Sequence, residues 1–263
     1  MMKNNRSSWL LLPYGIFMAA FVVLPLLVVI YYGFTNTEGR LSFENFISFF
    51  TNTRTLGTLV YSLVIALLTT FICLIIAYPV AYILAKGAYS RRHAFLMVFI
   101  LPMWINFTLR ITAMKEILTL LEGNLAYYQF FNAVLCMVYD FLPFMIMPIY
   151  NSIAKLDDSM IEAGRDLGAT FMQTIFKVVI PLTIPGIMSG ITMVFLPSMT
   201  NYVVVDMVYN STYIMGSLIG SYFSSYDWHN GSVVSVILLL IISLVTYVSD
   251  RASAGKEAAK DNG

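Results

Sequence analysis

The feature that most constrains this chain is a series of long apolar segments that carry few or no charges. A helix that crosses the hydrocarbon core of a bilayer needs about 20 mostly apolar residues. Because these segments are continuously apolar and do not alternate, we expect helices rather than the strands of a membrane barrel. Six spans account for them: residues 10–33, 58–85, 94–118, 126–150, 183–205 and 231–249.

The composition excludes an ordinary soluble protein. Only 11% of the 263 residues are charged and 59% are hydrophobic, whereas a soluble domain carries about a quarter of charged residues. The net charge of +1 argues against a basic nucleic-acid-binding domain, so no nucleic-acid partner is expected. Cys73 and Cys136 lie in apolar runs, where packing is the expected role. The expected fold class is an all-α integral membrane protein with six transmembrane helices in the lipid bilayer.

The first span differs from a secretory signal peptide. Lys3 and Arg6 resemble the positively charged start of such a peptide. The apolar stretch that follows is longer than the about 7–15 residues expected there, and no convincing cleavage site closes it. We therefore expect an uncleaved membrane anchor.

The distribution of basic residues sets the orientation, because lysine and arginine are enriched in cytoplasmic loops. With the N-terminus inside, eleven fall on the inner side: Lys3, Arg6, Lys86, Arg91, Arg92, Lys155, Arg165, Lys177, Arg251, Lys256 and Lys260. Four fall on the outer side or in the outer part of a span: Arg40, Arg54, Arg110 and Lys115. Both termini are therefore predicted to be cytoplasmic.

Two outer segments need separate interpretation. Met207–Tyr226 carries no charge and could form a seventh span, which would move the C-terminal basic residues outside. Glycines and serines weaken it as a helix, so we expect a re-entrant or surface-lying segment. Leu41–Phe50 places aromatic and aliphatic residues at helical spacing and predicts a short helix on the membrane or on the bundle.

Sequence motifs for catalysis are absent. The chain has neither a phosphate-binding G-x-x-x-x-G-K-[ST] loop nor a zinc-binding H-E-x-x-H helix. The predicted topology places His93 and His229 on opposite sides of the membrane, so they cannot join one catalytic group. We expect no enzyme activity, no metal and no cofactor in this chain, and ATP would have to be used by a partner subunit.

The long cytoplasmic loop between spans four and five predicts a short, well-capped helix. Ser159 and Glu162 have the spacing of a capping box, which places the helix start near Met160. Asp157 would favour the same positively polarised helix end. Gly168 stands where a left-handed residue would end the helix. On composition alone, this could be a surface helix without a partner.

The same loop resembles the EAA loop of binding-protein-dependent ABC importer permeases. That pattern reads E-A-A, three residues, G, nine residues, then I-x-L-P. This chain keeps the spacing and departs at Gly164, Val178 and Ile180. The matching residues, with Asp166 between the glycines, are Glu162, Ala163, Gly164, Asp166, Gly168, Val178, Ile180 and Pro181.

Other stretches narrow the resemblance to spermidine/putrescine permease subunits, over nearly the whole chain. They are Pro102-x-Trp104-x-Asn106-x3-Arg110, Leu142–Met145, Arg165–Ala169 and Ile180–Gly186. One departure is the segment at about Thr119–Ala126, which is shorter here than in that family.

This resemblance implies a type I ABC importer permease fold and a set of partners. A bacterial cell membrane would hold this chain in a heterodimer with a second, related permease subunit. A pair of cytoplasmic ATPases would use the ATP, and an extracytoplasmic binding protein would deliver the polyamine. The loop helix would then be the coupling helix, seated in a groove of the ATPase. Residues 1–56 would form an N-terminal helix and outer loop, 57–250 the permease core with its EAA loop at about 155–181, and 251–263 a cytoplasmic tail.

Charged residues inside spans are costly and are therefore candidates for function. Arg110 and Asp140 could pair with each other, which we favour over substrate contact. Asp206 ends span five, one turn after Tyr202, and Trp104 lies within span three. Carboxylates and aromatic faces suit a polycation, although aromatic residues also form the interfacial belt of any membrane protein.

Three alternatives remain at this stage. The EAA loop is shared by importers of many solutes, so another small solute could be the substrate. An ion-gradient-driven transporter or channel would leave the loop unexplained. An intramembrane hydrolase would need paired catalytic groups at one depth, which the sequence lacks.

Overall fold

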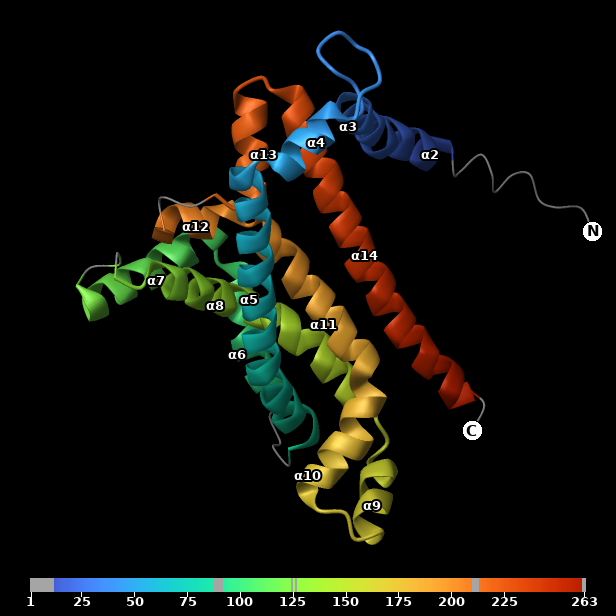
Figure 1. Cartoon of the computed structure of the whole chain (residues 1–263). Coiled ribbons are helices and arrows are strands. Elements are labelled where there is room, and N and C mark those ends of the chain that lie inside the picture. The colour runs from blue at the N-terminus through green and yellow to red at the C-terminus, as the bar shows by residue number, and fades with distance from the viewer. Residues whose placement is uncertain (1–11, 88–91, 124, 126, 210–212, 262–263) are drawn as a thin grey trace, which may run out of the picture. The chain divides into compact units, whose positions relative to one another are not determined.

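The computed structural model describes residues 12–87, 92–123, 125, 127–209 and 213–261. The basic residues Lys3, Arg6 and Arg91, which entered the orientation argument, lie outside these ranges. The described residues form helices, with one isolated β-bridge between Thr35 and Leu41. Figure 1 shows the helices α2 (Leu12–Met18), α3 (Leu24–Gly33), α4 (Glu44–Thr51), α5 (Thr53–Lys86), α6 (Arg92–Ile100), α7 (Phe107–Glu122), α8 (Gln129–Ala154), α9 (Asp158–Asp166), α10 (Phe171–Thr174), α11 (Ile180–Thr200), α12 (Tyr202–Tyr209), α13 (Met215–Ser224) and α14 (Trp228–Asp261).

Long apolar helices occur where the sequence predicts spans. Among the described residues, five helical segments are long and apolar enough to cross a membrane, and a sharply bent pair makes a sixth if it counts as one span. The five are Leu12–Gly33, Thr53–Lys86, Gln129–Ala154, Phe171–Thr200 and Trp228–Ala252. The all-helical fold class is therefore confirmed.

The third span is broken, which the sequence analysis did not predict. Ala94–Trp104 and Phe107–Glu122 meet at an angle of 97°. The first segment ends in a 3₁₀ turn, Leu101–Trp104, and Ile105 has extended backbone. Asn106 then caps α7, because its side-chain oxygen accepts a hydrogen bond from the backbone N–H of Thr108 at 2.9 Å. A proline inside the 3₁₀ turn and a strong N-cap after it together place the break.

The fifth span has different ends from those predicted. The helical segment begins at Phe171 rather than at residue 183, and it ends at Thr200 rather than at 205. Asn201 leaves the helical region with φ −75° and ψ 77°, and α12 then begins as a separate helix. A π-helical turn at Ile175–Val179 comes directly before the Ile180-Pro181 start of α11. Prolines remove a backbone donor, and a wider turn accommodates that loss.

The chain divides into two compact units, of which the first comprises Met1–Gly57 and Ser217–Ile241. Within it, α3 packs closely on α14: a Cβ at Gly33 would lie 3.6 Å from Val236. The Nδ1 of His229 lies 3.0 Å from the carbonyl oxygen of Tyr32, and their rings meet edge to face. The predicted outer helix is present as α4, with Phe49 buried and Phe50 exposed.

The second unit comprises Thr58–Gly216 and Ile242–Gly263, and its core forms around α8. Helix α11 approaches α8 very closely at two glycines. A Cβ at Gly186 would lie 2.7 Å from the carbonyl oxygen of Pro148, and one at Gly190 would lie 2.7 Å from the Met145 sulfur. These glycines let the two backbones approach within the membrane, where small residues replace the hydrophobic effect as the basis of packing.

The alternative of a seventh span is not found. In the described part of Met207–Tyr226, the structure has the end of the eight-residue α12 and the ten-residue α13. Both are far shorter than the about 20 residues needed to cross a bilayer. The prediction of a short, non-spanning segment fits these helices.

Candidate functional site

The cytoplasmic loop contains the predicted helix, but its start differs. Helix α9 covers Asp158–Asp166, and its N-cap is Asp157, whose side chain accepts a hydrogen bond from the backbone N–H of Ser159 at 3.0 Å. The predicted capping box of Ser159 and Glu162 is therefore wrong. That backbone hydrogen bond, followed by the Ser159 side chain and the nearby Lys86 charge, holds the pKa of Asp157 below its ordinary value. Aspartate and serine are equally good caps, but the carboxylate of Asp157 also brings a negative charge to the positively polarised helix end.

The predicted end of the helix is confirmed. Gly168 has φ +80°, in the left-handed region. Its N–H donates to the carbonyl of Arg165 at 2.8 Å, and the N–H of Ala169 donates to the carbonyl of Gly164 at 3.2 Å. These two bonds form a Schellman motif, which satisfies carbonyls at the helix end. Both ends of a nine-residue helix are thus fixed.

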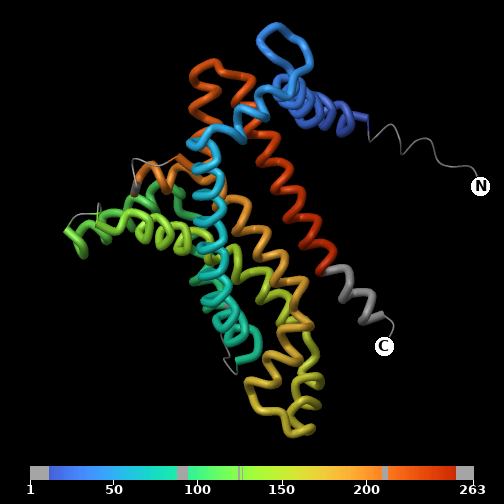
Figure 2. The backbone as a smooth tube through the Cα atoms, viewed as in Figure 1, coloured from blue at the N-terminus to red at the C-terminus, as the bar shows by residue number. Residues whose placement is uncertain are grey.

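One face of α9 packs and the opposite face is open. Ile161 is buried, and a Cβ at Gly164 would lie 3.6 Å from Val178 and 3.8 Å from Thr174. Glu162, Ala163 and Asp166 are exposed, and Leu167 is 89% exposed. Figure 2 shows the yellow α9 and α10 segment folding back towards α11 at one end of the second unit. The segment therefore presents a rigid, mixed polar and apolar surface.

The return from α9 to α11 has a cap that the sequence analysis missed. Thr170 and Gln173 form a reciprocal capping box at the start of α10. Its signature, a threonine followed three residues later by glutamine, is visible in the sequence. Pro181 is the second residue of α11 and follows directly on the π-helical turn Ile175–Val179, so it lies within the continuous helical segment Phe171–Thr200.

Lys86 is a second residue of this region that the sequence analysis missed, since it was counted only among the basic loop residues. Its Nζ donates to the carbonyl oxygen of Leu156 at 2.6 Å and to Asp158 at 2.5 Å. Lys86 ends α5, whereas Leu156 and Asp158 lie at the entry to α9. The pairing joins residues 70 positions apart in the chain, which no local pattern reveals.

Arg110 and Asp140 form the predicted ion pair, between the Nη2 of Arg110 in α7 and a carboxylate oxygen of Asp140 in α8. The residues are only 7% and 2% exposed. The Nε and Nη1 of Arg110 have no hydrogen-bond partner among the described residues. Charges so deeply buried persist only when paired. The pair faces the interior of the second unit, and this supports a structural role.

The remaining substrate-pathway candidates lie on two elements. Trp104 lies at the break of the third span and is 85% exposed. Tyr202 and Asp206 lie on α12 rather than at the end of span five, so that part of the prediction is wrong. Both are exposed, while Val204, Val205 and Val208 are buried. Helix α12 packs on α7 and α8, and partial desolvation raises the pKa of Asp206 above its ordinary value although the side chain reaches solvent.

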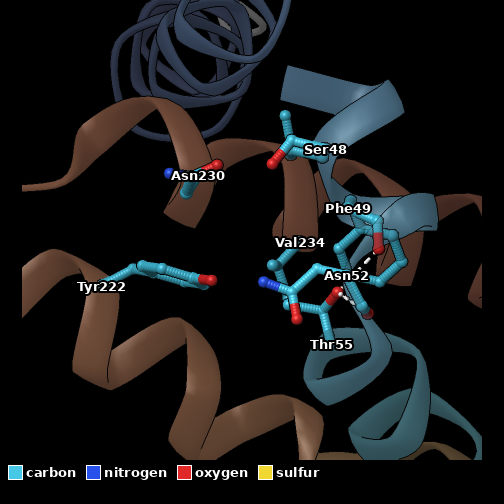
Figure 3. Close-up of a pocket in the computed structure, with 8 residues that line it drawn as sticks. Ser48, Phe49, Asn52, Thr55, Tyr222, Asn230 and Val234 are labelled. Carbon is cyan, nitrogen blue, oxygen red and sulfur yellow. Dashed lines mark hydrogen bonds between the residues drawn. The ribbon is translucent and has the colours of Figure 1, made fainter. Parts of the chain in front are cut away.

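A small cavity lies in the first unit. Figure 3 shows Tyr222 facing Asn52 across it, with Ser48 and Asn230 at its edge. It has a volume of about 80 Å³ and a lining of neutral side chains: Ser48, Phe49, Asn52, Thr55, Tyr222, Asn230, Val233 and Val234. The hydroxyl of Thr55 donates to the carbonyl of Phe49 at 2.6 Å. This hydroxyl therefore stabilises the junction of α4 and α5.

A family model and individual relatives relate this chain to the same kind of transport protein. Residues 1–254 match the family model described as "Binding-protein-dependent transport system inner membrane component". The spermidine/putrescine transport system permease protein PotB of Escherichia coli is 36% identical over 256 residues, covering 89% of this chain and 92% of that protein. PotB of Haemophilus influenzae is 34% identical over 255 residues, covering 89% of each chain.

Solved structures of low sequence identity have the same fold. A chain of a bacterial alginate ABC transporter, in complex with a periplasmic protein, superposes with a TM-score of 0.73 at 13% identity, covering 96% of both chains. A chain of the MetNI methionine ABC transporter superposes with a TM-score of 0.59 at 20% identity, covering 78% of this chain and 99% of that chain. The arrangement of helices is therefore shared with chains of an alginate transporter and of a methionine transporter.

Proposed function

This chain belongs to the family of binding-protein-dependent transport system inner membrane components, and we propose that it carries spermidine and putrescine across the membrane. It is a multi-pass inner membrane subunit of a bacterial ABC importer, in which ATP hydrolysis resides in partner subunits and a periplasmic binding protein takes part. The observation that carries the substrate proposal is the 36% identity with PotB of Escherichia coli over 89% of this chain.

The proposed assembly has four kinds of protein. This chain would form a heterodimer with a second permease subunit of the PotC type. A dimer of cytoplasmic ATPases would bind on the cytoplasmic side of the membrane, and an extracytoplasmic polyamine-binding protein would deliver the substrate on the outer side. Family membership leaves the ion-gradient transporter without support. Another small solute remains the second candidate, because alginate and methionine importers share the fold.

We also propose that α9 is the coupling helix that contacts the ATPase. Four features support this role: capping at both ends, the packed Gly164, exposed Glu162 and Ala163, and the almost fully exposed Leu167. A helix held in this way can transmit a rigid-body displacement. Asp166, Gly168 and Pro181 would act by shaping the segment, since they lie at its end and at its return to α11.

The proposed substrate pathway uses the exposed face of α12. Asp206 and Tyr202 are four residues apart on one helix, so they share a face. A carboxylate beside an aromatic ring suits an organic polycation by charge and by cation–π attraction. Trp104 would add a second aromatic face. Arg110 and Asp140 are assigned to structure rather than to the pathway, because they neutralise each other in a buried position.

Reconstitution tests the substrate proposal directly. The complete complex, with both permease subunits, the ATPases and the binding protein, is placed in liposomes with labelled spermidine or putrescine. Uptake should require both ATP and the binding protein. Labelled methionine serves as the matched small-solute control. ATP-dependent methionine uptake without polyamine uptake would replace this proposal with the second candidate.

Two substitutions test the coupling helix. Gly168→Val puts a β-branched residue at φ +80°, where such residues are strongly disfavoured, and Glu162→Lys puts positive charge near the positively polarised helix end. Both should abolish uptake while the subunit remains inserted. Gly39→Val is the matched control, since Gly39 has φ +75° in an outer turn. Normal uptake by both coupling variants would make α9 a passive surface helix.

A further inference from the structure

One face of α5 contacts both ends of the segment that contains the proposed coupling helix, residues 155–183, which we call the coupling segment. Tyr78, Tyr82 and Lys86 follow one another at intervals of four residues, so they form a row along the cytoplasmic half of this helix. The Tyr78 hydroxyl lies 3.1 Å from the Thr183 hydroxyl in α11. The Tyr82 ring meets the Phe171 ring of α10 edge to face, with 5.9 Å between centroids.

Lys86 completes this row with two hydrogen bonds. Its ammonium donates to the Leu156 carbonyl and to Asp158, and its side chain is only 12% exposed. Lysine is rarely buried to this extent unless it is paired. At the last residue of α5, its charge also stabilises the negatively polarised helix end.

The hydrogen bond from Lys86 to the Leu156 carbonyl matters as much as the ion pair with Asp158. The Asp158 side chain is 74% exposed, and an exposed ion pair alone contributes little. Leu156, however, lies in the short connection between α8 and α9. A charged donor on its carbonyl is a strong hydrogen bond and fixes the backbone at the point where the chain enters the coupling helix.

We propose that Lys86 is a positioning residue that ties the coupling helix to span α5, so that a displacement of α9 moves α5. This inference rests on the proposed role of α9. The two tyrosines hold the return of the segment, at α10 and α11, while Lys86 holds its entry. Without Lys86, the connection between α8 and α9 is no longer held to α5. ATP hydrolysis is then expected to move α9 with less effect on the membrane helices.

The experiment measures polyamine uptake and ATP hydrolysis by the reconstituted complex. Lys86→Met removes the charge and both hydrogen bonds but keeps an unbranched apolar side chain. Lys86→Arg keeps the charge, and Asp158→Asn removes only the exposed anion. Lys155→Met is the matched control, because Lys155 begins the same connection with an exposed side chain.

We expect Lys86→Met to lower the number of polyamine molecules transported per ATP hydrolysed by about tenfold, within the range found for residues that couple two sites. Lys86→Arg should restore most of this ratio, Asp158→Asn should lower it about twofold, and Lys155→Met should leave it unchanged. A purely structural role would reduce the amount of assembled complex and leave the ratio unchanged in what remains.

A wild-type ratio for Lys86→Met, or a fall equal to that of Lys155→Met, would overturn the inference. The result stays distinguishable from failure of the coupling-helix proposal. In that case Gly168→Val and Glu162→Lys would also transport normally, whereas failure of this inference alone would leave those two variants inactive.

Discussion

The buried ion pair gives the most discriminating stability prediction. Asp140→Asn keeps the shape of the side chain but leaves the Arg110 guanidinium buried without a counter-charge. Arg110 is 7% exposed, and its Nε and Nη1 have no hydrogen-bond partner among the described residues, so the Asp140 carboxylate supplies its charge compensation. Removing one member of a buried pair costs about 3–5 kcal/mol, which corresponds to a fall in melting temperature of about 6–20 °C for a chain of this size.

The assay is the apparent melting temperature of the purified subunit in detergent, followed by loss of the monodisperse peak after heating. The double variant Arg110→Met with Asp140→Leu removes both charges and should recover most of the loss, since apolar replacements of buried pairs are often neutral. The structural reasoning is refuted if Asp140→Asn melts within about 2 °C of wild type. Loss of polyamine uptake at unchanged stability would instead place Asp140 in the substrate pathway.

Three further predictions concern packing, substrate charge and topology. Gly186→Ala places a Cβ 2.7 Å from a backbone oxygen of α8 and should lower the free energy of unfolding by about 1–3 kcal/mol; Gly220→Ala, in open space, is its thermal-melting control. Asp206→Asn should reduce initial polyamine uptake sharply and Asp206→Glu only slightly, whereas equal rates would exclude a charge effect. A cysteine at Ser42 should react with an impermeant thiol reagent from outside intact cells and one at Ser253 should not; labelling of the latter would reverse the C-terminal orientation.

The membrane helices could be predicted from the sequence because a segment that crosses the bilayer must be mostly apolar. A run of apolar residues without charge has few stable arrangements other than a spanning helix, so most helices lie where the runs lie. The end of α9 was equally predictable, because a left-handed position strongly favours glycine and Gly168 stood at the right distance.

Two of the errors share one physical cause, which is that apolar composition does not report local backbone geometry. The break before α7 and the end of α11 at Thr200 both occur inside apolar runs. Asn106 and Asn201 mark these positions, and both were visible in the sequence. Asparagine is also tolerated inside helices, so the residue type alone does not tell whether a helix continues or ends there. The N-cap of α9 is a separate, local error, because Asp157 rather than Ser159 accepts the capping hydrogen bond.

The accessibility of the carboxylates in this chain limits where a polycation can be bound. A polyamine needs carboxylates that it can reach, and the ion pair with Arg110 removes Asp140 from that group by burial and by neutralisation. Asp206 on α12 remains accessible, but a single carboxylate cannot balance a ligand with several positive charges at low dielectric. Neutralising such a ligand along the pathway therefore requires further acidic groups, because the aromatic rings of Tyr202 and Trp104 attract a cation without cancelling its charge. In the heterodimer that we propose, the second permease subunit would supply such groups, which would give the assembly an electrostatic reason as well as a mechanical one.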